Sequence, residues 1–280
     1  MATHHRSGDR ENSTRRESLR LIGLVGLAAV TGCGSSGATS GTPPRTSGTG
    51  AGGAGNTGGT GSDGAVGPDG VGDVSGAGKP PSCTLRPAQT EGPYFLDDTL
   101  NRTDIRSNPS DGAVMPGAPL RLAFHVGGVT GTSCAPLAGA IVDIWQCDAA
   151  GVYSGFRDFG GLFDTTGKKF LRGFQSTGSD GTCQFLTIYP GWYPGRSVHI
   201  HFKIRATHAG RALELTSQLY FPDALSDQVF ARAPYSSHTG PRTLNSADGI
   251  FGRVGSDLLL APTSEGEGYT ATFDVGLQLG

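Results

Sequence analysis

The chain has 280 residues, 47 of which are glycine, and a formal net charge of −2 at pH 7. The glycines follow no three-residue repeat, which excludes a collagen-like fibre. No block of basic residues lies beyond the first twenty positions, so the composition argues against a nucleic-acid-binding protein. No apolar run reaches the ~18 residues that predict a transmembrane helix.

The N-terminal segment predicts export rather than a folded element. Arg15 and Arg16 precede a short apolar run at residues 21–30, which is the pattern of a twin-arginine export signal. Small residues and then Cys33 end the run and resemble a lipobox, so we expect residues 1–33 to be a signal and Cys33 to carry a lipid. The lipid would anchor the chain at the cell envelope, on the periplasmic or extracellular face. An uncleaved signal anchor is the alternative, and the run is short for it because a span needs ~20 residues.

Residues 34–81 predict a flexible tether. They contain 17 glycines in 48 positions and no aromatic residue. Chains rich in glycine and serine behave as random coils. We therefore expect a linker that holds the domain at residues 82–280 away from the membrane.

Four cysteines other than Cys33 belong to the predicted domain: Cys83, Cys134, Cys147 and Cys183. An even number of cysteines in an exported chain is typical of disulfides, so up to two are expected. Three pairings are possible, and four buried thiols are the alternative. No C-x-x-C pair occurs, which disfavours a thiolate metal site.

Residues 82–280 are predicted to form one all-β domain. Alternating or β-branched segments lie at residues 120–126, 140–147, 182–188, 198–205, 214–221 and 270–279. Turn residues follow or separate them at 148–151 and 179–181. No long segment with a helical period competes, so the regular spacing of short strands favours a β-sandwich.

Two histidines in one predicted strand point to a metal site. Residues two apart in a strand face the same side. His199 and His201 should therefore project together, while Val198, Ile200 and Phe202 face the core. Paired imidazoles are a common metal half-site; two ordinary, partly exposed histidines are the alternative.

Two tyrosines sharpen the metal prediction. Prolines and glycines at 190–195 hold Tyr193 on a stiff turn just before the histidines, and Tyr153 follows the predicted strand at 140–147. A phenol has a pKa of ~10, so a phenolate at neutral pH needs a strong Lewis acid beside it. Ferric iron fits because two phenolates and one hydroxide balance its charge. Taken alone, Tyr153 is also compatible with a loop aromatic that caps the core.

Together these motifs resemble the intradiol ring-cleavage dioxygenases, the group of catechol 1,2-dioxygenase and protocatechuate 3,4-dioxygenase. The resemblance rests on Tyr153, on the pattern P-G-x-Y-P at 190–194 and on R-x-x-H-x-H at 196–201. It extends to the segments 90–95, 136–146 and 217–221, so it covers residues 83–223 in the expected order.

The resemblance implies a β-sandwich that holds a non-haem Fe(III) through four ligands. These would be Tyr153, Tyr193, His199 and His201, with Tyr193 and His199 axial. Tyr193 would also take a proton from the substrate.

Two further residues have roles that the resemblance implies. Arg196 would face the reacting ring and stabilise negative charge that develops there. Gln218 would hydrogen-bond near the same ring. Tyr189 is not expected to be a ligand, because the family tyrosine lies within the P-G-x-Y turn.

The implied activity is cleavage of a catechol-type ring by O₂ between its two hydroxylated carbons, to a cis,cis-muconate-type product. The partners would be a small aromatic diol and O₂; the oligomeric state stays open. Two departures leave the substrate open: a short loop between Tyr193 and Arg196, and a linker where catechol 1,2-dioxygenases have a helical segment. The alternative is a prealbumin-like surface domain that binds a ligand or glycan without catalysis.

Overall fold

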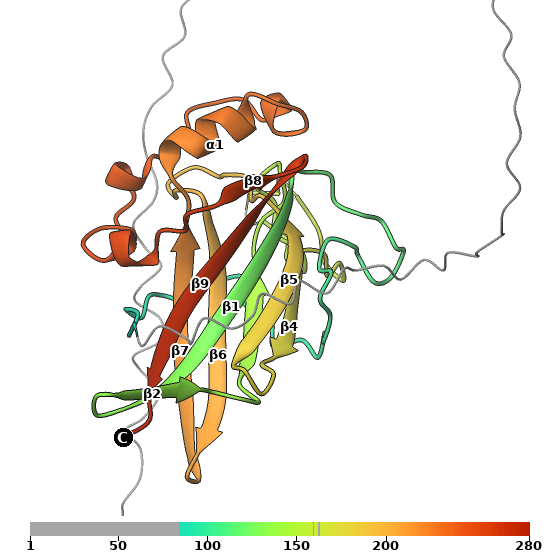
Figure 1. Cartoon of the computed structure of the whole chain (residues 1–280). Coiled ribbons are helices and arrows are strands. Elements are labelled where there is room, and N and C mark those ends of the chain that lie inside the picture. The colour runs from blue at the N-terminus through green and yellow to red at the C-terminus, as the bar shows by residue number, and fades with distance from the viewer. Residues whose placement is uncertain (1–83, 159, 162) are drawn as a thin grey trace, which may run out of the picture. The chain divides into compact units, whose positions relative to one another are not determined.

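The computed structural model describes residues 84–158, 160–161 and 163–280 (Figure 1). The predicted signal at 1–33, the predicted linker at 34–81 and Cys83 lie outside these residues. Among the described residues, no helix is long and apolar enough to cross a membrane.

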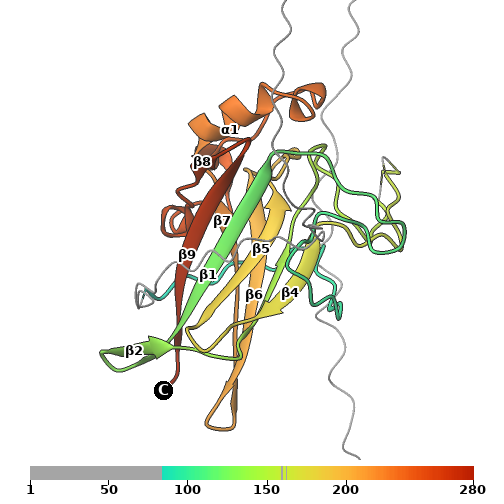
Figure 2. The same cartoon turned by 45° about the vertical axis from the view of Figure 1, so that its right-hand side comes forward.

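The strands form two sheets that pack face to face. The first has the order β2 (Ser133–Pro136), β1 (Pro119–Thr130), β9 (Gly268–Gln278) and β8 (Thr263–Glu265), and β5 (Thr182–Ile188) also pairs with β1. The second has the order β4 (Arg172–Ser176), β3 (Ile141–Trp145), β6 (His199–His208) and β7 (Arg211–Tyr220). Figure 2 shows β9, β1 and β5 side by side in one layer.

Aromatic side chains fill the space between the sheets. The ring of Phe124 on β1 contacts Phe202 on β6 at 5.6 Å between centroids and Phe273 on β9 at 6.0 Å. All three residues are almost fully buried. The predicted all-β sandwich is therefore confirmed.

The predicted strands all occur, and all but one have shifted ends. The prediction at 182–188 matches β5, and the prediction at 120–126 covers only part of β1. Three short strands were not predicted: β2, β4 and β8. The helix α1 (Asp223–Phe230) and the 3-10 helices η1 (Tyr235–Ser237), η2 (Asn245–Ala247) and η3 (Gly255–Leu258) were not predicted either. Each of these elements has eight residues or fewer, too few to show a clear period.

Two of the cysteines are buried thiols. Cys147 and Cys183 are not disulfide-bonded and are less than a tenth exposed. Burial raises the pKa of Cys183 to about 12 and raises that of Cys147 as well, which leaves both thiols protonated and unreactive. The prediction of a second disulfide is therefore wrong for these two residues.

The end of β3, the start of β6 and the end of β7 lie together at one end of the sandwich. Figure 1 shows that β7 ends near α1. In the antiparallel register His199, at the start of β6, pairs with Tyr220, at the end of β7. His201 pairs with Trp145, the last residue of β3. The loops that follow β3 and precede β6 therefore come together there.

Close backbone contacts hold these two loops against each other. The carbonyl of Asp148 accepts hydrogen bonds from the backbone N–H of Gly151 (3.0 Å) and of Gly191 (3.1 Å). A Cβ on Gly151 would lie 2.2 Å from the Trp192 carbonyl oxygen, and Gly151 has a φ of +83°. Only glycine fits such an approach. The contacts between the two loops therefore fix the backbone positions of Tyr153 and Tyr193.

We predict that Gly151→Ala destabilises the protein more than Gly167→Ala. Both glycines have positive φ, but a Cβ on Gly167 meets nothing within 4 Å. The conformational cost of about 1 to 2 kcal/mol is common to both variants. The clash at Gly151 adds about 1 to 3 kcal/mol.

Urea unfolding of the two variants and the wild type measures the difference in free energy of unfolding. Equal losses in the two variants would mean that the backbone contact between the loops contributes nothing.

Candidate metal centre

Strand β6 presents two buried histidines on one side. His199 is 2% exposed and His201 is 1% exposed, whereas Ile200 and Phe202 lie in the core cluster between the sheets. This alternation follows from strand geometry. The predicted orientation of the two imidazoles is therefore confirmed by the structure, and the alternative of partly exposed histidines is wrong.

Two tyrosine hydroxyls converge on the same imidazole nitrogen. His199 Nε2 lies 3.3 Å from Tyr153 Oη, 3.2 Å from Tyr193 Oη and 3.1 Å from His201 Nε2. Tyr153 comes from the loop after β3 and Tyr193 from the loop before β6. The structure thus brings together all four residues that the sequence analysis expected as ligands.

A backbone hydrogen bond defines the protonation of His199. Its Nδ1 lies 2.6 Å from the Ser197 carbonyl oxygen, which can only accept a hydrogen bond. The proton is therefore on Nδ1, and Nε2 carries a lone pair directed at the other three polar atoms. Burial, with the nearby charge of Arg196, lowers the pKa of His199 to about 3, so the ring is neutral.

His201 is oriented by stacking. Its ring lies parallel to the indole of Trp145, 5.0 Å between centroids and 6° between planes. Its Nδ1 is buried without a hydrogen-bond partner in the described part of the chain. Burial and the neighbouring His199 hold the pKa of His201 well below its ordinary value, so this imidazole is neutral too.

The phenols need a cation to ionise. Burial raises the pKa of Tyr193, and burial together with the neighbouring Tyr193 raises that of Tyr153, so without a cation both stay protonated. A bound metal ion reverses this preference because it stabilises the phenolate directly.

The spacing of the four donors fits a metal ion. Ligands at ~2.1 Å from a metal, separated by angles of roughly 90 to 110°, lie about 3.0 to 3.4 Å apart. The separations from His199 Nε2 to the other three donors are 3.1 to 3.3 Å. Two ligands on opposite sides of a metal would lie about 4.2 Å apart, so the 3.2 Å between Tyr193 Oη and His199 Nε2 does not fit the axial placement of these two residues that the resemblance implies. Two of the four donors at this centre are phenols, so it does not contain three metal-binding residues of the types His, Cys, Asp or Glu. No such group of three or more occurs elsewhere within the described ranges either.

The segment at 90–95 covers the centre. Tyr94 stacks on Tyr153 with 4.3 Å between ring centroids and 15° between planes. A Cβ on Gly92 would lie 3.2 Å from His201 Cε1. This segment therefore packs against two of the four expected ligands.

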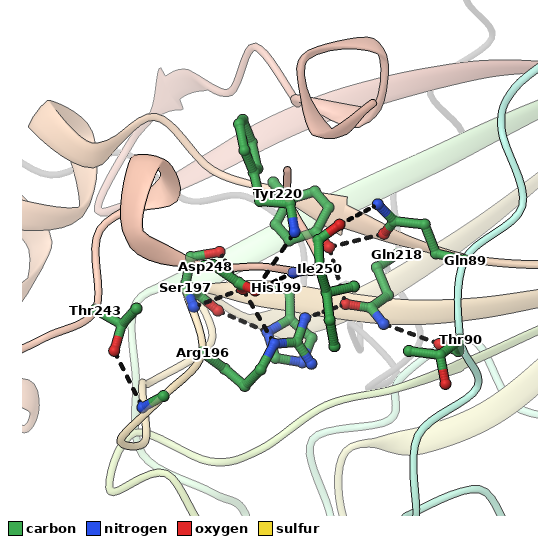
Figure 3. Close-up of polar contacts among 12 residues, drawn as sticks. Gln89, Thr90, Arg196, Ser197, His199, Gln218, Tyr220, Thr243, Asp248 and Ile250 are labelled. Atoms are coloured by element: carbon green, nitrogen blue, oxygen red, sulfur yellow. Dashed lines mark hydrogen bonds and ion pairs between the residues drawn. The ribbon is translucent and has the colours of Figure 1, made fainter. Parts of the chain in front are cut away.

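Arg196 and Gln218 lie beside the centre and contact each other (Figure 3). Arg196 Nη2 donates to Gln218 Oε1, and Gln218 Nε2 donates to the Thr90 carbonyl at 2.8 Å. Burial lowers the pKa of Arg196, but the opposite charges available on Tyr193 and Asp248 raise it overall, so the guanidinium is charged.

Two residues form the tight turn between Tyr193 and Arg196. Pro194 and Gly195 occupy its centre, Gly195 has a φ of +86°, and Arg196 N lies 3.4 Å from the Tyr193 carbonyl oxygen. This is the chemistry of a type II turn. It places Tyr193 and Arg196 on the same side of the loop.

Tyr189 lies outside the centre, as predicted. Its hydroxyl hydrogen-bonds to Ser226 Oγ at 2.8 Å, and its ring packs on Phe221 within the core. Tyr189 is a structural residue.

Two features of the centre were not predicted from the sequence. Asp248 pairs with Arg196 at 3.0 Å from a loop far along the chain, and Trp145 supports His201. An Asp-Gly turn signal at 248–249 was visible, but it does not reveal what the carboxylate contacts.

Comparison with known proteins gives a consistent result. A family model described as dioxygenase matches residues 90–248. Catechol 1,2-dioxygenase 1 of Acinetobacter lwoffii is 31% identical over 155 residues, which are 47% of this chain and 45% of that protein. The chain therefore spans less than half of that relative's length.

Two other proteins are similar over more of their length. The protocatechuate 3,4-dioxygenase beta chain of Burkholderia cepacia is 31% identical over 176 residues, 59% of this chain and 68% of that one. The solved structure of an intradiol ring-cleavage dioxygenase from Tetranychus urticae is 30% identical with a TM-score of 0.61, covering 70% of this chain and 95% of that one. The resemblance seen in the motifs is confirmed: the chain belongs to the intradiol ring-cleavage dioxygenase family.

Proposed function

We propose that this chain cleaves a catechol-type ring with O₂ between the two hydroxylated carbons and forms a cis,cis-muconate-type product. The observation that carries the proposal is the convergence of two phenol oxygens and His201 Nε2 on the lone pair of His199 Nε2, all within 3.3 Å. The relatives support it, since their names describe dioxygenases that act on catechol and on protocatechuate.

The donor set favours non-haem Fe(III) held by Tyr153, Tyr193, His199 and His201. Two phenolates and a hydroxide neutralise three positive charges, and a near-neutral centre avoids the cost of a buried net charge. When bound, ferric iron would supply a Lewis acid that lowers the pKa of the diol's hydroxyl groups and makes the ring reactive toward O₂.

The two tyrosines have different freedom, which suggests different roles. Tyr153 is 1% exposed and lies under the ring of Tyr94. Tyr193 is only partly buried and lies next to the turn at Pro194 and Gly195. We therefore assign Tyr193 the mobile role: its Oη accepts a proton from a hydroxyl of the diol, while Tyr153 stays in place.

Arg196 acts on the charge of the substrate. A catechol that loses its protons becomes anionic, and a fixed guanidinium beside it stabilises negative charge on the ring oxygens. Gln218 holds the guanidinium from the β7 side. Neither residue needs to gain or lose a proton for this role.

A binding module without catalysis explains less of the structure. A prealbumin-like domain would account for the sandwich, but not for two neutral buried imidazoles that face one buried and one partly buried phenol. We also propose that the chain is exported by the twin-arginine route and anchored through Cys33; the paired arginines and the cysteine after the apolar run support this.

We predict that the full chain, purified from iron-replete cells, contains iron equimolar with the chain and is wine-red from tyrosinate-to-Fe(III) charge transfer. His201→Ala should lose both the colour and the iron. His208→Ala, at the exposed end of the same strand, should keep both. Iron analysis and visible spectra test this, and a colourless, iron-free wild type would refute the metal centre.

We predict that Tyr193→Phe alters the visible band and lowers kcat for catechol by about 100-fold or more, the usual effect of removing a general base. Tyr189→Phe is the matched control, because Tyr189 belongs to the same stretch of chain but bonds to Ser226 in the core. It should leave the band unchanged. The measurements are O₂ uptake and absorption spectra, and an unaltered band in Tyr193→Phe would remove Tyr193 from the ligand set.

A further inference from the structure

One buried carboxylate joins Arg196 to the start of strand β6. Asp248 follows η2 and is 2% exposed. Its Oδ2 accepts hydrogen bonds from Arg196 Nε at 3.0 Å and from the backbone N and Oγ of Ser197, both at 2.9 Å. Its Oδ1 accepts from Ile250 N at 2.8 Å. Figure 3 shows these contacts, which leave both oxygens fully engaged.

The first branch of this network fixes the guanidinium of Arg196. Asp248 holds it at Nε, and Gln218 holds it at Nη2. Gln218 is itself held by the Thr90 carbonyl, and its Oε1 also accepts from the Tyr220 hydroxyl at 3.1 Å. Anchors on two sides leave the guanidinium plane little freedom to rotate.

The second branch reaches His199 through Ser197. Asp248 binds Ser197 by both its backbone N–H and its hydroxyl. The carbonyl of the same residue accepts the Nδ1 proton of His199 at 2.6 Å. Partners behind a metal-binding histidine fix its tautomer and ring orientation. Asp248 thereby determines where the His199 lone pair points.

The site requires a carboxylate, because every group that faces it is a donor. Asp248 Oδ2 faces three N–H or O–H groups, and Oδ1 faces the N–H of Ile250. An asparagine at this position has one amide oxygen and one amide nitrogen, and the nitrogen only donates hydrogen bonds. Whichever way the amide is turned, its nitrogen would face donors that need an acceptor. It would also leave the partly buried charge of Arg196 without its ion-pair partner.

We propose that Asp248 is the positioning residue of this centre: one carboxylate sets the guanidinium of Arg196 and the imidazole of His199 in a fixed relation to each other. Asp248 contacts none of the four expected metal ligands and acts through Arg196 and Ser197. The inference rests on the proposed function, because the position of Arg196 affects the rate only if negative charge develops on a substrate beside it.

A double-mutant cycle tests the first branch. Asp248→Asn should keep its iron but lower kcat for catechol by about 10- to 100-fold, with KM changing less, since the effect is on charge stabilisation. Arg196→Met should lower kcat at least as far. The two losses should not multiply: the double variant should be slower than Arg196→Met by much less than the factor that Asp248→Asn alone costs, because only the branch through Ser197 is left to lose. Multiplying losses would overturn the proposal.

Asp223→Asn is the matched control. Asp223 also holds the loop that leads to Asp248, through Arg242 and the N–H of Asn245, but it touches neither Arg196 nor Ser197. It should leave kcat and the visible band unchanged. If this variant is as slow as Asp248→Asn, general loosening of the loop explains the loss and the proposal fails.

Ser197→Ala tests the second branch. It also keeps the proposal testable if Asp248→Asn does not fold. It removes one of the three donors to Oδ2 and leaves the ion pair with Arg196 intact. We expect a folded, iron-loaded protein whose charge-transfer band is shifted from that of the wild type. A wild-type spectrum in Ser197→Ala would overturn this branch.

The spectra also separate this proposal from the proposed function. If the red wild-type protein consumes no O₂ with any catechol tested, the proposed function fails. The positioning role of Asp248 is then decided by the charge-transfer band alone. A shifted band in both Asp248→Asn and Ser197→Ala would still support the positioning role. An unshifted band in both would refute it whether or not the wild type is active.

Discussion

Because successive side chains of a strand face opposite ways, β6 places Ile200 and Phe202 between the two sheets and His199 and His201 on the other side. The first pair packs against the sheet of β1 and β9, which fixes the strand. The second pair then has almost no freedom of position. The precision of the centre thus comes from the core, since moving either imidazole along the sheet would also move aromatic side chains out of a packed interior.

The side of β6 that carries the two histidines must also be shielded from water. The segment 84–98, which precedes β1, covers it. Lys203 forms ion pairs with Glu91, and Arg205 forms ion pairs with Asp97 and Asp143. The pairs with Glu91 and Asp97 link the segment before β1 to β6, whereas Asp143 lies on the neighbouring strand β3. The same stretch lays Gly92 and Tyr94 over His201 and Tyr153. Burial of both imidazoles then keeps them neutral, which is the state that binds a metal.

Much of the centre could be predicted from the sequence because its signals are local. His199 and His201 are two residues apart in a strand pattern, and Tyr193 lies in a turn defined by its own prolines and glycines. Tyr153 was harder, since its proximity depends on how the loop after β3 packs. Its place after a predicted strand made it a candidate, but only the family resemblance favoured a ligand over an aromatic residue that caps the core. The structure supplies the physical reason, which is the backbone contact of Gly151 with Trp192.

The features that could not be predicted are those that depend on distant contacts. Asp248 is 52 residues from Arg196, and nothing in an Asp-Gly turn specifies a partner that far away. The stacking of Trp145 on His201 depends on the register between β3 and β6, which is set by the whole sandwich. Short strands such as β4 and β8 were missed for a related reason: with five residues or fewer, pairing with a neighbour decides their structure.

The ion pair of Arg196 and Asp248 solves an electrostatic problem of such a centre. Under the proposed function a cation that faces the ring would help an anionic substrate, but a largely buried guanidinium without a partner is costly and would also repel a metal ion held nearby. Asp248 cancels the net charge while leaving the guanidinium in place, because it binds Nε and leaves other N–H groups of Arg196 to face elsewhere. The pair therefore presents a directed dipole rather than a free charge. Its orientation is set by Gln218 at one end and Ser197 at the other, so the electrostatics of the centre and its geometry depend on the same few hydrogen bonds.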